Sequence, residues 1–324
     1  MFEMREGHCC PRVSVAVNVV LALVDAIVAA ISFFQLIRIH LRNLQIRWTR
    51  QKVFHLMIGS SNLGYFIYVV LTLVAACNGW AWWSQICGFI FMAFPKILLF
   101  SAFLLLLSFW VDLCHQRDEE DDDEGSFVEE AFLEKTLNES RLASIDSHRK
   151  CFPVRLFHVG SRQKIVILVT VLVFVIMLAF AVIIWIGLGK NPIVSAVAAR
   201  VYIDFFALLM LLLAGALACY GILLCLKMSK VRSEEASSEM WKVSGLTIVS
   251  VLCFTSSAFV ALLTDISIPY HWRKLHANCA YTSVLLILYY FVGVSIPSAM
   301  VLWVIRELPP TITKAINIHK NQVC

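Results

Sequence analysis

Charged side chains are scarce in this chain of 324 residues: Asp, Glu, Lys and Arg make up 15% of it, and hydrophobic residues make up 60%. Soluble domains usually carry about 25% charged and about 45–50% apolar residues. The alternation of apolar and polar residues that marks a membrane-spanning β-strand is also missing. These absences argue against a soluble domain and a β-barrel. They leave an all-α membrane protein, because a helix satisfies its own backbone hydrogen bonds in lipid.

The common catalytic motifs are missing as well. The sequence has no HExxH motif, no Gly-rich phosphate loop and no CxxC pair. Asp112 and His115 are three residues apart and share a helix face, with His55 at the same level, which brings a His/Asp metal site to mind. We interpret these residues instead as part of a partner-binding rim or as interhelical hydrogen-bonding groups. We therefore expect no enzymatic activity, no cofactor, no metal and no nucleic-acid partner.

The sequence does contain seven long apolar runs. A spanning helix needs about 20 apolar residues, and runs of that kind lie near 13–37, 53–77, 87–114, 165–187, 197–226, 241–268 and 281–305. They predict one seven-helix membrane domain that covers residues 1–324. The long connection near 115–164 begins with the acidic stretch HQRDEEDDDEG, and such a block of like charge predicts a disordered cytosolic loop.

Basic residues are distributed unevenly between the two sets of connections. Arg38, Arg42, Arg47 and Arg50 follow the first run, and Arg306 follows the last run. The connections after the third and fifth runs are also rich in Lys and Arg, whereas the alternate connections carry few. The positive-inside rule therefore predicts an N-terminus outside the cell or in a lumen, and a cytosolic C-terminus.

Four charged residues are predicted inside the membrane, namely Asp25, Lys96, Asp204 and Asp265. A Lys near the middle of a spanning helix costs roughly 3 kcal/mol on insertion scales, so Lys96 predicts a partner or a wet cavity. At about 1.5 Å per residue, Asp25, Lys96 and Asp204 lie about 18, about 13 and about 10 Å deep from the helix starts that we assume. We interpret Lys96 as the partner of Asp204 or Asp25, and a ligand pocket or an ion path is the alternative.

Two cysteines flank the connection between the second and third runs. Cys77 and Cys87 would form a disulfide in an oxidising compartment and stay reduced elsewhere. The sequence leaves both possibilities open.

Small residues gather in two of the runs. The second run contains Gly59-Ser-Ser-Asn-Leu-Gly64, and the fifth contains several Ala and Gly residues around Gly215 and Gly221. Such residues allow close helix packing in a membrane. In the last run, Pro297 predicts a kink, because proline lacks a backbone N–H and its ring collides with the preceding turn.

Four stretches resemble one protein family. They are FQLIRIHLRNLQIRWTRQKVFHLM (34–57), LLFSAFLLLLSFWVDLCHQ (98–116), VSGLTIVSVLCFT (243–255) and YYFVGVSIPSAMVLWVIRELPP (289–310). In order and position they are similar to the plant tobamovirus multiplication protein family. Some members are also described as candidate G-protein-coupled receptors, and animal orphan receptor-like proteins with lysosomal roles resemble the family more distantly.

The resemblance implies a seven-pass protein of the vacuolar membrane, another endomembrane or the plasma membrane. It also implies partnership with an Arf-like small GTPase or a heterotrimeric Gα subunit, use as a membrane anchor by tobamovirus replication protein, and a role in plant–microbe interaction. We expect a scaffold that presents a cytosolic rim to the GTPase, formed by Arg38, Arg42, Arg47, Arg50, Asp112, His115 and Arg306. A ligand-sensing receptor with its pocket near Lys96 is the alternative, and a transporter is a further one.

Overall fold

The computed structural model describes residues 12–42, 50–78, 87–137, 154–190, 192–229, 234–264 and 279–307. Its helices are α1 (Arg12–Arg42), α2 (Arg50–Asn78), α3 (Gly88–Leu137), α4 (Val154–Lys190), α5 (Pro192–Ser229), α6 (Glu234–Leu263), α7 (Cys279–Leu286), the π-helix η3 (Ile287–Ser295) and α8 (Ile296–Glu307). The last three follow one another without a break and form a single spanning segment. No strand occurs within the described ranges.

Within the described part of the chain, seven segments are long and apolar enough to cross a membrane. They are Val15–Leu41, Gln51–Ala75, Gly88–Cys114, Ile165–Ile186, Val197–Leu226, Trp241–Leu263 and Ser283–Ile305. Each coincides with a predicted apolar run to within a few residues at either end. This agreement confirms the prediction of an all-α protein with seven spanning helices.

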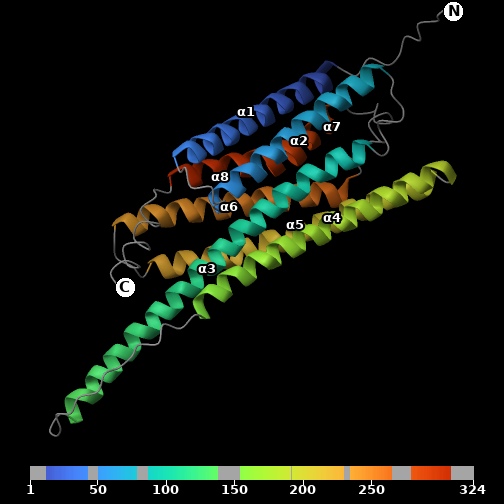
Figure 1. Ribbon diagram of the computed structural model, residues 1–324. Coiled ribbons are helices and arrows are strands. Elements are labelled where there is room, and N and C mark those ends of the chain that lie inside the picture. The colour runs from blue at the N-terminus through green and yellow to red at the C-terminus, as the bar shows by residue number, and fades with distance from the viewer. Residues whose placement is uncertain are drawn as a thin grey trace, which may run out of the picture.

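The spanning helices lie side by side and run up and down through one bundle (Figure 1). We call the end at which α1 begins the N end, and the end at which α8 finishes the C end. The C-terminal part of α3 projects beyond the bundle at the C end (Figure 1). Residues 115–137 are thus helical, where the sequence analysis expected a disordered loop; the stretch EEAFLEKTL in this part is rich in strong helix formers. Residues 138–153 lie outside the described part of the chain.

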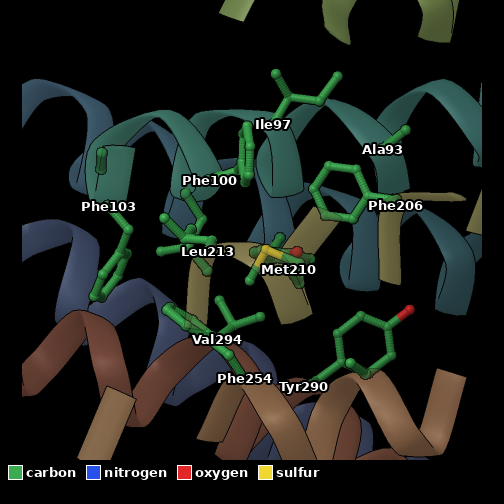
Figure 2. Packing of buried hydrophobic residues seen from close by; sticks show 14 of the residues in the cluster. Ala93, Ile97, Phe100, Phe103, Phe206, Met210, Leu213, Phe254, Tyr290 and Val294 are labelled. Atoms are coloured by element: carbon green, nitrogen blue, oxygen red, sulfur yellow. The ribbon is translucent and has the colours of Figure 1, made fainter. Parts of the chain in front are cut away.

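The core of the bundle is built around α3, which packs against α2, α4 and α5. Phe103 of α3 meets Phe254 of α6 edge to face with ring centroids 4.6 Å apart, and Phe100 meets Phe206 of α5 at 5.9 Å. Figure 2 shows these rings pointing into the space between the helices, beside Val294 of η3. Such edge-to-face pairs are favourable because the positive edge of one ring faces the negative face of the other.

Helices α2 and α3 approach closely at the level of Pro95. A Cβ atom added to Gly64 would lie 2.6 Å from Cγ of Pro95, so only glycine permits this spacing. The hydroxyl of Ser61 donates a hydrogen bond to the carbonyl of Pro95 at 2.7 Å. The close packing predicted for the second run is confirmed at this point, and it fixes the turn of α3 that carries Lys96.

Candidate functional site

A small cavity lies inside the bundle between α2, α3, α5, α6 and η3. Its polar lining residues are Tyr65, Lys96, Tyr202, Ser257 and Tyr289, and most of the remaining wall is apolar. The centres of water-sized spheres can occupy about 30 Å³ of this cavity. One water molecule needs about 10–15 Å³ on that measure, so the cavity holds about two. Sites for drug-sized ligands are far larger, at about 300–1,000 Å³.

Lys96 lies at the wall of this cavity, as its sequence position suggested. Its Nζ atom lies 3.7 Å from the centroid of the Tyr289 ring, in a cation–π contact. Among the residues that the structure describes, no carboxylate lies within ion-pair distance of Nζ. The predicted pairing of Lys96 with Asp204 or Asp25 is therefore wrong in this structure, because both acids have partners of their own.

Asp204 pairs with Arg200, one turn earlier on the same helix. Arg200 Nε lies 3.2 Å from Asp204 Oδ1, which is the contact expected of opposite charges at positions i and i+4. The same guanidinium donates to the carbonyls of Thr264 at 2.7 Å and Leu262 at 2.6 Å. It thereby caps the end of α6 and ties it to α5 near the N end. The sequence analysis missed Arg200, although the spacing Arg-x-x-x-Asp inside the fifth run was a usable signal.

Asp25 lies in a different environment, between α1 and η3. Its side chain is buried, and the hydroxyl of Ser295 donates a hydrogen bond to its Oδ1 at 2.8 Å. Asp25 does not line the cavity. A hydrogen bond to a carboxylate is stronger than one between neutral groups, so the bond from Ser295 offsets part of the cost of burying this acid. The three residues predicted as one cluster thus occupy three separate sites.

Two tyrosines that line the cavity carry hydroxyls without a hydrogen-bond partner among the described residues. Tyr65 and Tyr202 are almost completely buried, and the hydroxyl oxygen of each is unpaired within the described part of the chain. A buried hydroxyl that makes no hydrogen bond is costly, so each such group needs an explanation. The sequence analysis missed both residues, because a tyrosine in an apolar run gives no sign of which helix it faces.

His55 makes hydrogen bonds that hold α1 against α2 near the C end. Its Nδ1 lies 2.8 Å from the Gln51 carbonyl oxygen, and its Nε2 lies 2.9 Å from Oε1 of Gln35 on α1. Ser32 also donates to the carbonyl of His55 at 2.7 Å. This confirms the interpretation of His55 as an interhelical hydrogen-bonding group. The described side chains contain no group of three His, Cys, Asp or Glu residues that could hold a metal ion.

The predicted partner rim remains a prediction. Arg38 is exposed near the C end. Asp112 is partly buried, and its side chain interacts with another group of the protein. The other side chains of the rim lie outside the described residues, namely Arg42, Arg47, Arg50, His115 and Arg306. At the opposite end, Cys87 carries a free thiol. The side chain of Cys77 lies outside the described residues, so the disulfide considered for Cys77 and Cys87 stays a prediction.

Comparison with known proteins decides the family. The model of the THH1/TOM1/TOM3 domain matches residues 12–128 and 159–320. The chain belongs to the THH1/TOM1/TOM3 family. The part left out between the two matched segments falls within the long connection after the third apolar run. The resemblance drawn from the four sequence stretches is thereby confirmed.

The relatives of this THH1/TOM1/TOM3 family member are distant but cover most of its length. It is 24% identical to tobamovirus multiplication protein 1 of Nicotiana tabacum over 289 residues, which are 88% of this chain and 82% of the relative. It is 25% identical to tobamovirus multiplication protein 1 of Arabidopsis thaliana over 88% of this chain and 81% of the relative. For tobamovirus multiplication protein 3 of Nicotiana tabacum the identity is 25%, over 90% and 82%. No solved structure matches the chain significantly.

Proposed function

We propose that this chain is a receptor-like membrane scaffold without enzymatic activity that presents its cytosolic end to a GTPase, either Arf-like or a heterotrimeric Gα subunit. It acts in plant–microbe interaction, and tobamovirus replication protein can use it as a membrane anchor. The observation that carries the proposal is the family match along nearly the whole bundle, to relatives named for tobamovirus multiplication. The vacuolar membrane, another endomembrane and the plasma membrane all fit this function.

The C end is the end that we assign to the cytosol and to the partner. The described helix ends Arg42, Arg50 and Glu307 lie at this end. The sequences that connect α1 to α2 and that follow α8 are basic, as the positive-inside rule requires of cytosolic segments. The hydrogen bonds of Ser32, Gln35 and His55 hold α1 and α2 together just inside this end. A firmly held pair of helices supports a basic docking surface, because a preorganised surface loses less conformational entropy on binding.

The test is a binding measurement with the full chain purified in mild detergent. The partners are a GTP-loaded Arf-like GTPase, a Gα subunit and tobamovirus replication protein, each measured separately. In the variant, Arg38, Arg42, Arg47 and Arg50 are replaced by Glu, and the control carries Arg12→Glu at the N end. Reversed charges on a complementary surface are strongly unfavourable, so we expect the variant to bind at least about tenfold more weakly and the control to bind normally. Equal binding by both variants, or binding to none of the three partners, would refute the proposal.

The cavity beside Lys96 favours a second candidate, a receptor that senses a small ligand. The two candidates differ in their dependence on this residue. A scaffold keeps its partner binding in a Lys96→Ala variant that is expressed normally, whereas a ligand-gated receptor loses its response. The measurement is ligand-independent GTPase binding by the variant, compared with wild type at matched expression.

A further inference from the structure

The described residues that line the cavity beside Lys96 include hydrogen-bond donors without acceptors, and a positive charge without a negative one. The ammonium group of Lys96 contacts the face of the Tyr289 ring. The face of an aromatic ring attracts a cation but carries no net negative charge. This contact therefore offsets only part of the cost of placing a cation in the membrane. The N–H groups that point away from the ring have no acceptor among the described side chains.

The acids that could balance this charge are engaged elsewhere. Asp204 pairs with Arg200, and Asp25 accepts the hydrogen bond of Ser295 outside the cavity. Neither acid lines the cavity. An unbalanced charge in a medium of low dielectric constant is unfavourable, and a counter-ion inside the cavity removes that cost.

Two further donors belong to residues that line the same cavity. The hydroxyls of Tyr65 and Tyr202, on α2 and α5, are buried and unpaired in the described part of the bundle. Both residues line the cavity together with Lys96. Because the ammonium can only donate, and each hydroxyl can donate the one proton that it carries, all three groups are satisfied at once by an acceptor.

The volume of the cavity limits what this acceptor is. Space for about two water molecules admits a monatomic anion and leaves too little room for a nucleotide or another ligand of drug size. Water alone would satisfy the two hydroxyls but would leave the charge of Lys96 without a counter-ion. A small anion does both.

We propose that the cavity binds a single inorganic anion of halide size, with Lys96 as its counter-charge and the hydroxyls of Tyr65 and Tyr202 as its hydrogen-bond donors. This site is independent of the scaffold function, because it lies inside the bundle and involves none of the residues of the rim. Bound halide stabilises the bundle by linking α2, α3 and α5.

The test measures the unfolding temperature of the full chain in detergent as chloride or bromide is added. Sodium gluconate replaces the halide salt, so that the sodium concentration and the ionic strength stay constant. We expect a saturable rise in unfolding temperature with either halide, because a ligand that binds only the folded state stabilises it. Radioactive chloride, displaced by unlabelled chloride in equilibrium binding, gives an independent readout and is expected to show one site per chain.

Three variants and one control locate the site. Lys96→Met is expected to remove the halide response. Tyr65→Phe and Tyr202→Phe keep the rings and are each expected to raise the half-saturating halide concentration about tenfold, because each loses one hydrogen bond to a charged group. Ser250→Ala removes a buried, unpaired hydroxyl that does not line the cavity, and should respond like wild type.

The outcomes separate the proposal from its rivals. A folded wild-type chain with no saturable halide binding would overturn it and leave a cavity that holds only water. A halide response unchanged in the two Tyr→Phe variants would also overturn it, by placing the ion elsewhere. If Lys96→Met does not fold, these two variants decide the question.

Discussion

Arg200 provides a stability test that separates two kinds of interaction at one side chain. The guanidinium donates hydrogen bonds to the carbonyls of Thr264 and Leu262 at the end of α6, and it also forms an ion pair with Asp204 on its own helix. The exposed fractions of the two charged side chains are 26% for Arg200 and 38% for Asp204. Replacing each residue by Ala shows whether the link between α5 and α6 or the ion pair carries the stability.

The two contributions differ in expected size. A hydrogen bond from a charged donor contributes about 1.5–3 kcal/mol, so the loss of two such bonds in Arg200→Ala is expected to cost about 3 kcal/mol or more. A partly exposed ion pair within one helix contributes about 0–1 kcal/mol, so Asp204→Ala is expected to cost about 1 kcal/mol or less. Arg200→Lys keeps the charge but loses the planar fork that reaches two carbonyls, and it should fall between the two.

The assay is thermal unfolding in detergent, followed by the fluorescence of tryptophan, of which Trp110 is buried in α3. With about 2–4 °C per kcal/mol for a bundle of this size, Arg200→Ala should lower the midpoint by about 6–12 °C. Asp204→Ala should lower it by about 4 °C at most. Equal losses in the two variants would refute the reasoning, because they would assign the stability to the ion pair instead of the cap on α6.

Two further substitutions test the packing and the polar contacts inside the bundle. Gly64→Ala should lose about 1–3 kcal/mol of stability, because the new Cβ would lie 2.6 Å from Cγ of Pro95; the control Gly215→Ala has no neighbouring atom within 4 Å and should leave the midpoint within error of wild type in thermal unfolding. Ser295→Ala should lose about 1–3 kcal/mol, because it leaves the buried carboxylate of Asp25 without its donor. In a double-mutant cycle, Asp25→Asn should recover part of that loss, and strictly additive effects would contradict the contact.

The spanning segments were predictable because the membrane imposes a length and a composition on each of them. A run of about 20 apolar residues can only cross lipid as a helix, and this condition does not depend on which helices become neighbours. The extension of α3 to Leu137 was not predicted. In that stretch, helix propensity and charge repulsion oppose each other, and the composition of the segment gives no rule for which one prevails.

The partners of buried polar residues were predicted poorly, since they depend on the register between helices. Arg200 and Asp204 are four residues apart, and their contact was readable from the sequence. Asp25 and Ser295 are 270 positions apart, and no local pattern connects them. Lys96 was recognised as a residue that needs a partner or a cavity, but the cavity itself is made by side chains from five different elements.

The places where helices pack closely were also only partly predictable from the small residues in the sequence. Gly64 and Gly215 lie in similar small-residue stretches, and the sequence predicts close packing for both. The structure places Gly64 against the ring of Pro95 and, in the fifth run, Gly221 against Thr247 of α6, whereas Gly215 faces open space. A stretch of small residues therefore indicates that close approach is allowed, and only the arrangement of the helices determines where it happens.

The winding of η3 connects the surroundings of Asp25 and Lys96. Pro297 follows this π-helix and has no N–H to donate, and its ring would collide with the carbonyl four residues earlier in a regular α-helix. In the structure, the N–H of Ile296 bonds to the carbonyl of Phe291, five residues back.

A π turn holds about one residue more than an α turn, which rotates the side chains that follow by about 100°. This rotation lets Tyr289 contact Lys96 of α3 while Ser295, six residues later, bonds to Asp25 of α1. An unbroken α-helix would turn one of these two side chains away, so the contacts of Lys96 and Asp25 both depend on the winding of the same nine residues.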